Sequence, residues 1–119
     1  MSKSVVGMIG LGIMGSAMSA NLMKDGFTVV GYDVADDCVQ AHVKRGGVGV
    51  TSIKELARAA EFIFTSLPSV AAFETVIWGE DGFLAAGSGS PIIIETSTLE
   101  IDLKQRGHDA LKDSGNVML

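Results

Sequence analysis

The feature that most constrains the fold is a set of three glycines placed directly after a short apolar segment. Residues 4–9 have the composition of a buried strand, and Gly10, Gly12 and Gly15 follow it in the spacing G-x-G-x-x-G. A segment with apolar residues at helical spacing comes next, at 15–24. A strand that turns through such glycines into a helix presents the free N–H groups of the helix start to a pyrophosphate. The pattern therefore predicts a dinucleotide-binding turn at the first strand of a parallel sheet.

Each glycine of this turn has its own expected task. Gly10 permits a tight turn, Gly12 lets the backbone approach a pyrophosphate because it has no Cβ, and Gly15 lets the helix lie close to the strand. The alternative is a glycine-rich strand-to-helix turn without a ligand.

An acidic residue stands where this fingerprint requires one, about 20 residues after the glycines. Asp33 ends a second apolar run, 27–32, and its carboxylate would accept hydrogen bonds from the adenosine ribose hydroxyls. The same carboxylate would repel a 2′-phosphate, and Val34 and Ala35 follow it instead of an arginine. The sequence thus favours NAD over NADP. The alternative role for Asp33 is to cap a helix that begins near Asp36.

Short apolar runs alternate with helix-compatible segments along the whole chain. The expected strands are 4–9, 27–32, 48–50, 62–65, 91–95 and 116–119, and the expected helices are 15–24, 36–44, 52–60, 69–78 and 99–113, with a loop at 79–90 that includes a short helical turn at 83–85. Strands that are nearly continuous apolar runs are typical of parallel sheets covered on both faces. The prediction is an α/β fold, a Rossmann-like doubly wound parallel sheet with strand order 3-2-1-4-5-6. Residues 1–119 are expected to form one dinucleotide-binding domain.

Composition argues against several other classes. A net charge of −5 offers no electrostatic footprint for nucleic acid or an anionic membrane, and no apolar run is long enough for a membrane span. One cysteine, Cys38, excludes an internal disulfide framework, and with two distant histidines it predicts no metal site. His42 and His108 are predicted to be surface residues without an acid–base partner. We expect a cytoplasmic protein.

The segment around the glycines resembles a known family. The run GLGIMGSAMSANLMKDGFTVVGYD, residues 10–33, is similar to the β-hydroxyacid dehydrogenases. This family includes 3-hydroxyisobutyrate dehydrogenases and tartronate semialdehyde reductases, and it is related to 6-phosphogluconate dehydrogenase. Ser66-Leu67-Pro68, Trp78-Gly79-Glu80-Asp81-Gly82 and Glu95-Thr96-Ser97-Thr98 extend the resemblance over the rest of the chain.

The resemblance implies the cofactor-binding domain of an NAD(P)-dependent oxidoreductase that acts on a small 3-hydroxy acid. It assigns cofactor contacts to Gly10, Leu11, Gly12, Ile13, Met14, Gly15, Asp33, Leu67, Pro68 and Thr98. Thr98 would lie near the nicotinamide ribose and the substrate. From the residues alone, Leu67-Pro68 could be a strand-ending turn, and Ser97 or Thr98 could cap the next helix.

The chain departs from the family pattern in three respects. Ala72 stands where the family often has an asparagine, and residues 99–102 lack the usual proline. The family's Ser-Gly-Gly substrate segment and its lysine acid/base would follow residue 119, so no catalytic residue is assigned. Lys104 and Lys112 are expected to be solvated helix lysines. The chain is expected to bind cofactor without turning over substrate, while a longer parent would bind the hydroxy acid and form a homo-oligomer.

Two alternatives remain open. The chain could be a non-catalytic dinucleotide-binding or protein-interaction module, because a fold does not fix a function. It could also be an exported protein, since Lys3, the apolar stretch 5–17 and the small residue Ala20 resemble a secretory signal.

Overall fold

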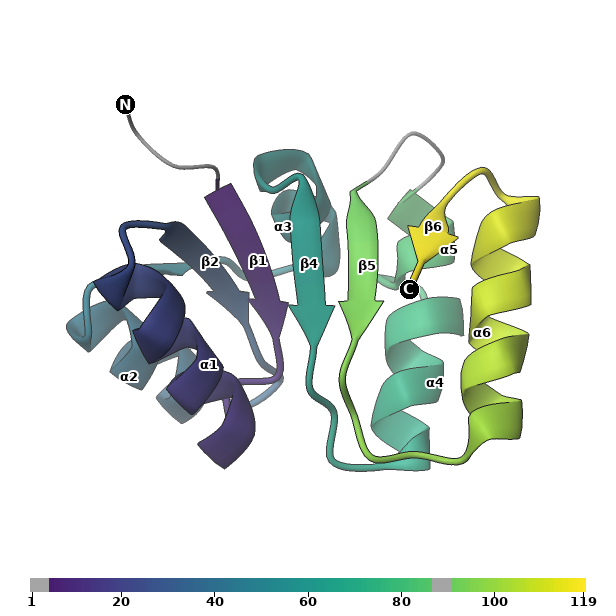
Figure 1. Ribbon diagram of the computed structural model, residues 1–119, viewed down its shortest axis with the longest axis horizontal. Helices are drawn as coiled ribbons and strands as arrows, with labels where there is room; N and C mark the ends of the chain where they lie inside the picture. Colours follow the sequence, from purple (N-terminus) through teal and green to yellow (C-terminus); the bar gives the residue numbers. More distant parts are fainter. Residues whose placement is uncertain (1–4, 87–90) are drawn as a thin grey trace.

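The computed structural model describes residues 5–86 and 91–119, which form a six-stranded parallel sheet flanked by helices. Along the chain the elements are β1 (Val5–Ile9), α1 (Ile13–Lys24), β2 (Thr28–Tyr32), α2 (Asp36–Lys44), β3 (Val48–Gly49), α3 (Ile53–Ala59), β4 (Phe62–Thr65), α4 (Val70–Trp78), α5 (Phe83–Ala86), β5 (Ile92–Glu95), α6 (Ile101–Asp113) and β6 (Val117–Met118). The strand order is β3-β2-β1-β4-β5-β6 (Figure 1). The predicted fold class and strand order are both confirmed.

Most element boundaries lie within two residues of their predicted positions. Helix α1 begins at Ile13 and α6 at Ile101, each two residues from its expected start. The short helical turn expected at 83–85 is α5. Ser4 of the first predicted strand and residues 87–90 of the predicted loop lie outside the described residues.

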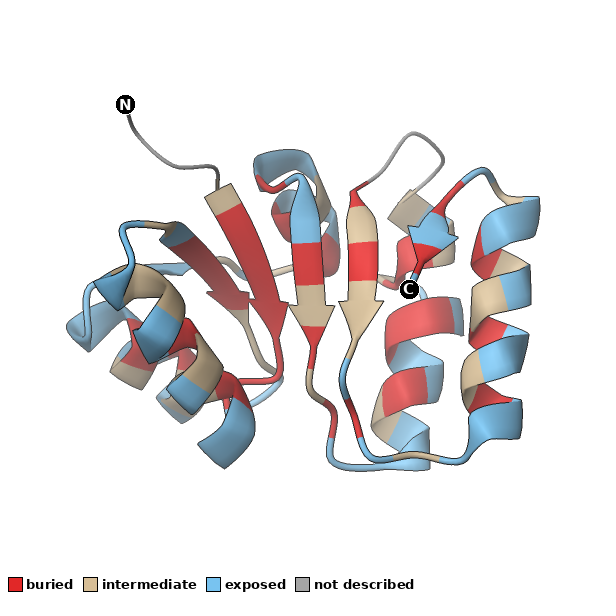
Figure 2. Ribbon diagram, in the orientation of Figure 1, coloured by how far each residue is buried: buried red, intermediate tan, exposed pale blue. Residues whose placement is uncertain are grey.

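The sheet separates two apolar layers of unequal size. The larger layer lies between the sheet and helices α3 to α6 and includes Phe73, Phe83 and Ile63, all fully buried. The smaller layer lies beneath α1 and α2 and is built from Met8, Leu11, Val29 and Val39. Strand β1 is buried from Val6 to Ile9 because both layers cover it (Figure 2).

Helix α6 packs closely on α4 at Gly107. A Cβ at this position would lie 2.8 Å from Cζ of Phe73. The glycine that lowers the helix propensity of this segment therefore has a packing reason, since a side chain there would push the two helices apart.

His42 is fully buried, so the prediction of a surface histidine is wrong. Its Nε2 lies 2.9 Å from the carbonyl oxygen of Val29, and its ring occupies the space left by Gly31 and Gly47. The spacing from Val39 to His42 places both on the helix face that covers the sheet.

The prediction that His108 has no acid–base partner is also wrong. This half-buried residue has Nδ1 3.2 Å from Oδ1 of Asp109, its neighbour in sequence. Hydrogen bonds from His108 and Gln105 lower the pKa of Asp109 below its usual value. Cys38 is half-buried on α2.

The described part of the chain lacks two kinds of feature. Within residues 5–86 and 91–119, no helix is long and apolar enough to cross a membrane. The same residues contain no group of three or more histidine, cysteine or acidic side chains placed to hold a metal ion.

Candidate functional site

The site lies where the chain leaves the carboxyl ends of β1, β2 and β4. After β1 the chain turns into α1 on one side of the sheet, whereas after β4 it leads to α4 on the other side (Figure 1). The Gly10 N–H donates to the Tyr32 carbonyl at 3.0 Å, and the Ser66 N–H donates to the Ile9 carbonyl at 2.9 Å. This divergence at the carboxyl edge is the place where open α/β sheets bind ligands.

Two of the three glycines are required by the protein's own packing. Gly10 has φ +95°, and a Cβ there would collide with the carbonyl oxygen of Ser66. A Cβ at Gly15 would collide with the carbonyl oxygen of Gly10, which lies directly against the helix. The tasks predicted for Gly10 and Gly15, a tight turn and a close helix–strand approach, both match this geometry.

Gly12 is different, because no packing contact requires it. A Cβ at Gly12 would have no heavy atom within 4 Å, and the backbone there is extended with φ −74°. The residue is exposed at the first turn of α1. A glycine in open space with an ordinary φ leaves room for something outside the chain to approach the backbone.

Helix α1 begins without compensation for its free N–H groups. Its N-cap, Gly12, makes no side-chain hydrogen bond, and its first turn contains no acidic residue. In contrast, Ser52 caps α3 through the Glu55 N–H and Ser69 caps α4 through the Ala72 N–H, each at 3.1 Å. The start of α1 therefore keeps its partial positive charge and its N–H donors for an anion.

The Asp33 carboxylate ties the glycine turn to the end of β2. Its Oδ2 accepts the Leu11 N–H at 2.7 Å, and its Oδ1 accepts the Ala35 N–H at 2.8 Å. Ala35, not Asp33, is the N-cap of α2, so the helix-capping alternative is wrong. Each carboxylate oxygen can accept a further hydrogen bond, because it has two lone pairs.

A groove of about 460 Å³ opens along the glycine turn. Its lining comes from the ends of β1, β2, β4 and β5 and from the start of α1. The lining residues are Gly10, Gly12, Ile13, Met14, Gly15, Met18, Asp33, Ser66, Leu67, Pro68, Thr96, Ser97 and Thr98. The structure thus brings together every predicted cofactor residue except Leu11, whose buried side chain joins the core beneath α1 and α2.

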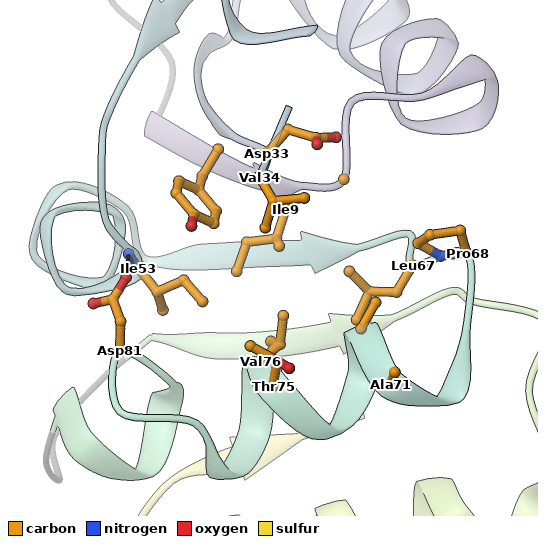
Figure 3. Close-up of a pocket in the computed structure, with 13 residues that line it drawn as sticks. Ile9, Asp33, Val34, Ile53, Leu67, Pro68, Ala71, Thr75, Val76 and Asp81 are labelled. Carbon is orange, nitrogen blue, oxygen red and sulfur yellow. Dashed lines mark hydrogen bonds between the residues drawn. The ribbon is translucent and has the colours of Figure 1, made fainter. Parts of the chain in front are cut away.

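An apolar cavity of about 280 Å³ adjoins this groove. Gly10, Asp33, Leu67 and Pro68 line both spaces. The rest of its lining is Ile9, Tyr32, Val34, Ile53, Ala71, Ala72, Thr75, Val76 and Asp81. Figure 3 shows Asp33 and Val34 on one side of the cavity, Thr75 and Val76 on the opposite side, and Asp81 at one end.

The segment after β5 is held by a network of polar side chains. Ser97 is buried, and its Oγ accepts the Leu67 N–H at 2.7 Å, while exposed Thr98 lines the groove. The N-cap of α6 is Glu100, so neither Ser97 nor Thr98 caps that helix. The backbone of Leu67 is therefore bonded to the segment that follows β5.

Lys104 is not a freely solvated lysine. Its Nζ lies 3.0 Å from Oε2 of Glu95, whose side chain is only 2% exposed. The other oxygen of Glu95 accepts the Ser97 N–H at 3.0 Å and the Thr65 hydroxyl at 3.2 Å. The ion pair compensates the charge of a nearly buried carboxylate. That carboxylate also holds Ser97, which lines the groove. Lys112 is exposed, as expected.

Asp81 and Tyr32 contribute polar groups to the apolar cavity and were not predicted as site residues. Asp81 Oδ2 accepts the Ile53 N–H at 2.9 Å, across 28 residues of sequence. Burial raises the pKa of the Tyr32 hydroxyl, and the negative charges of Asp81 and Asp33 raise it further. The motif Trp78-Gly79-Glu80-Asp81-Gly82 was the available sequence signal for Asp81, but it did not reveal this long-range contact.

Comparison with known proteins agrees with this geometry. Residues 5–119 match the family described as the NAD binding domain of 6-phosphogluconate dehydrogenase. The chain is 39% identical over 100 residues to a 2-(hydroxymethyl)glutarate dehydrogenase from Eubacterium barkeri, covering 83% of this chain and 33% of that protein. It is 32% identical over 114 residues to a 3-hydroxyisobutyrate dehydrogenase from Pseudomonas aeruginosa, covering 96% and 38%. The chain spans about a third of the length of these relatives.

Solved structures share the fold and include ligand complexes. A Mycobacterium tuberculosis 3-hydroxyisobutyrate dehydrogenase with L-serine superposes with a TM-score of 0.86 at 26% identity, covering 99% of this chain and 39% of that one. Psf3 in complex with NADP+ and 2-OPP gives 0.88 at 25% identity, covering 95% and 40%. Since the family match spans every described residue, the chain belongs to the family of NAD-binding domains found in 6-phosphogluconate dehydrogenase.

Proposed function

We propose that this chain holds NAD across the groove and the apolar cavity, as the cofactor-binding part of a dehydrogenase that acts on a small 3-hydroxy acid. The pyrophosphate would lie at the start of α1, and the adenosine ribose at Asp33. The nicotinamide end would extend toward Thr98. When bound, NAD supplies the hydride acceptor, and the chain supplies its placement.

The observation that carries this proposal is that an open backbone and an uncapped helix start occur together at Gly12. The backbone is open to approach there, and α1 begins with neither a cap nor an acidic side chain. Both features lower the stability of an isolated helix start, and both suit a phosphate that accepts its N–H groups. Leu11 would act through its backbone N–H, which fixes the orientation of Asp33.

The shape of the two spaces supports the orientation of the adenosine half. Asp33 borders both the groove and the apolar cavity, so a ribose bound there would direct its base into the cavity. The cavity has Val34 on one side and Thr75 and Val76 on the other, which suits the two faces of a flat aromatic ring.

The proposal favours NAD over NADP. None of the described residues that line the groove, the apolar cavity or the neighbouring surface hollow around Val39 is a lysine or arginine. A 2′-phosphate would face the Asp33 carboxylate, with Asp36 in the same hollow, and would find no basic side chain to compensate it.

The substrate class rests on the names of the relatives, which are dehydrogenases of 3-hydroxyisobutyrate and 2-(hydroxymethyl)glutarate. We extend the proposal to a cytoplasmic, self-associating parent protein that does not bind nucleic acid. A single cysteine and a net charge of −5 are consistent with that extension. Neither Lys104 nor Lys112 is proposed as catalytic, so the chain by itself should not turn over the hydroxy acid.

Calorimetric titration of the chain with NADH and NADPH tests the proposal. We expect saturable NADH binding and much weaker NADPH binding. Gly12→Val should abolish NADH binding while the chain stays folded, because its side chain would occupy the approach to the phosphates. Ala20→Val, at an exposed position on the same helix, is the matched control and should bind NADH normally. Equal affinity for NADPH would refute the role of Asp33, and no binding of either would refute the proposal.

A further inference from the structure

We propose that Asp81 recognises the exocyclic amino group of the cofactor's adenine and so makes this site selective against 6-oxopurines. This inference rests on the proposed binding of NAD and adds a residue that determines which base the apolar cavity accepts.

Asp81 lies in the loop between α4 and α5, at one end of the apolar cavity (Figure 3). Its orientation is fixed, because Oδ2 accepts the Ile53 N–H at 2.9 Å at the start of α3. Asp33 lines one side of the same cavity. A base that extends from a ribose at Asp33 would therefore point one edge toward Asp81.

The second oxygen of Asp81, Oδ1, has no hydrogen-bond partner among the described residues. An ionised carboxylate can only accept hydrogen bonds, and the neighbouring cavity wall at Ile53 and Val76 is apolar. This end of the cavity consequently presents an acceptor without a donor, on a residue that is only half-buried. A ligand whose edge displaces water from that oxygen has to bring an N–H to it or leave it unpaired.

Adenine supplies such a donor at its C6 amino group and an acceptor at N1, whereas hypoxanthine and guanine carry an acceptor oxygen at C6 and an N–H donor at N1, so both groups are exchanged along this edge. Two acceptors facing each other repel and also exclude the water that each had bound. Tyr32 lines the same cavity, and its hydroxyl has no hydrogen bond to any of the described residues. A tyrosine hydroxyl is protonated at neutral pH and can donate to a ring nitrogen. Burial and the two carboxylates raise the pKa of Tyr32 further above its ordinary value.

The test compares NADH with reduced nicotinamide hypoxanthine dinucleotide, which has an oxygen in place of the adenine amino group and a proton on the neighbouring ring nitrogen N1. Calorimetric titration of the chain should give about 10-fold weaker binding of the hypoxanthine cofactor. Asp81→Asn should remove or reverse this preference. The Asn oxygen can still accept the Ile53 N–H, while the amide N–H₂ donates to the 6-oxo group. Glu80→Gln changes the charge equally at the exposed neighbouring position and should keep the wild-type ratio.

Each outcome decides the matter. Equal binding of the two cofactors by the wild-type chain would overturn the inference, as would a preference that Asp81→Asn leaves unchanged. Circular dichroism of the folded variant separates recognition from misfolding, and an Asp81→Asn chain that fails to fold is replaced by Asp81→Ser, which should also remove the preference. If the chain binds neither cofactor, the proposed function fails and the inference fails with it. If NADH and the hypoxanthine cofactor bind equally well, only the inference about Asp81 fails and the proposed function stands.

Discussion

Helices α1 and α3 each begin at a space that Asp33 lines, the groove for α1 and the apolar cavity for α3, but their first turns are stabilised in opposite ways. In the seven-residue α3, two of the first N–H groups donate to side chains. The Glu55 N–H donates to Ser52, and the Ile53 N–H donates to Asp81. The twelve-residue α1 has no side-chain cap and no acid in its first turn. A short helix needs its ends satisfied by the protein, whereas a longer, packed helix tolerates free N–H groups. The difference separates a helix start used for stability from one available to a ligand.

The largest effect on stability is expected where the first turn of α1 packs against the glycine turn. Gly15→Ala should lower the free energy of unfolding by about 3 kcal/mol or more, because its Cβ would collide with the Gly10 carbonyl oxygen. Gly12→Ala, three residues away, should change it by about 0.5 kcal/mol or less, since the N-cap there makes no side-chain hydrogen bond. Urea unfolding measures both values. Equal losses would show that Gly12 also has a structural task.

The next effect concerns the carboxylate that fixes the glycine turn. Asp33→Ala leaves the Leu11 and Ala35 N–H groups without their acceptor and should cost about 2 kcal/mol in unfolding free energy. It should also abolish NADH binding in a calorimetric titration. Asp37→Ala removes the same charge from an exposed site on α2 and should cost about 0.5 kcal/mol with NADH binding retained. A stable Asp33→Ala chain with normal NADH affinity would contradict both proposed tasks.

A smaller effect is expected at the start of α3. Ser52→Ala removes the cap on the Glu55 N–H and should lower the free energy of unfolding by about 1 kcal/mol. NADH affinity should be unchanged, because this cap serves the protein and not the ligand. Ser69→Ala on α4 offers a second cap of the same geometry for comparison. Loss of NADH affinity in Ser52→Ala would mean that the two helix starts are not independent.

The smallest effect is electrostatic and can be observed directly. Tyr32 is the only tyrosine in the chain, so ultraviolet absorbance during alkaline titration reports its pKa alone. The pKa should lie above the ordinary value of 10.0, mainly because of burial, and Asp81→Asn should lower it toward 10.0. Because folding raises this pKa, the unfolded chain ionises first. The free energy of unfolding should therefore fall as the pH rises above 10 through the folded-state pKa. An unchanged pKa in Asp81→Asn would rule out the effect of that charge.

The sequence was sufficient to predict the fold and the glycine turn because both depend on local patterns, whereas Leu67, Pro68 and Thr98 were assigned through the family resemblance. The spacing of Gly10, Gly12 and Gly15 after an apolar run predicted the turn, and alternating strands and helices predicted the parallel order. The apolar cavity depends instead on contacts between segments far apart in sequence. The bond from Ile53 to Asp81 spans 28 residues, and no periodicity along the chain indicates it.

The error at His42 has a different cause. Histidine is a common surface residue, and its polarity concealed a helical spacing that already placed it beside Val39 on the buried face. Gly31 and Gly47 also indicated a buried histidine, since two residues without side chains leave room for an imidazole ring. That signal requires knowing which glycines face the helix, and this depends on the register of β2 with β3.

His42 also constrains how this protein can evolve. A Cβ at Gly31 would lie 2.8 Å from Cδ2 of the imidazole, and one at Gly47 would collide with Nε2. The imidazole ring and the two glycines therefore share one volume, so the order in which the three positions change matters. A lineage that exchanges His42 for a smaller residue becomes free to acquire side chains at 31 and 47, whereas one that changes a glycine first has to pass through a destabilised intermediate. Across related chains, these three positions are expected to change together.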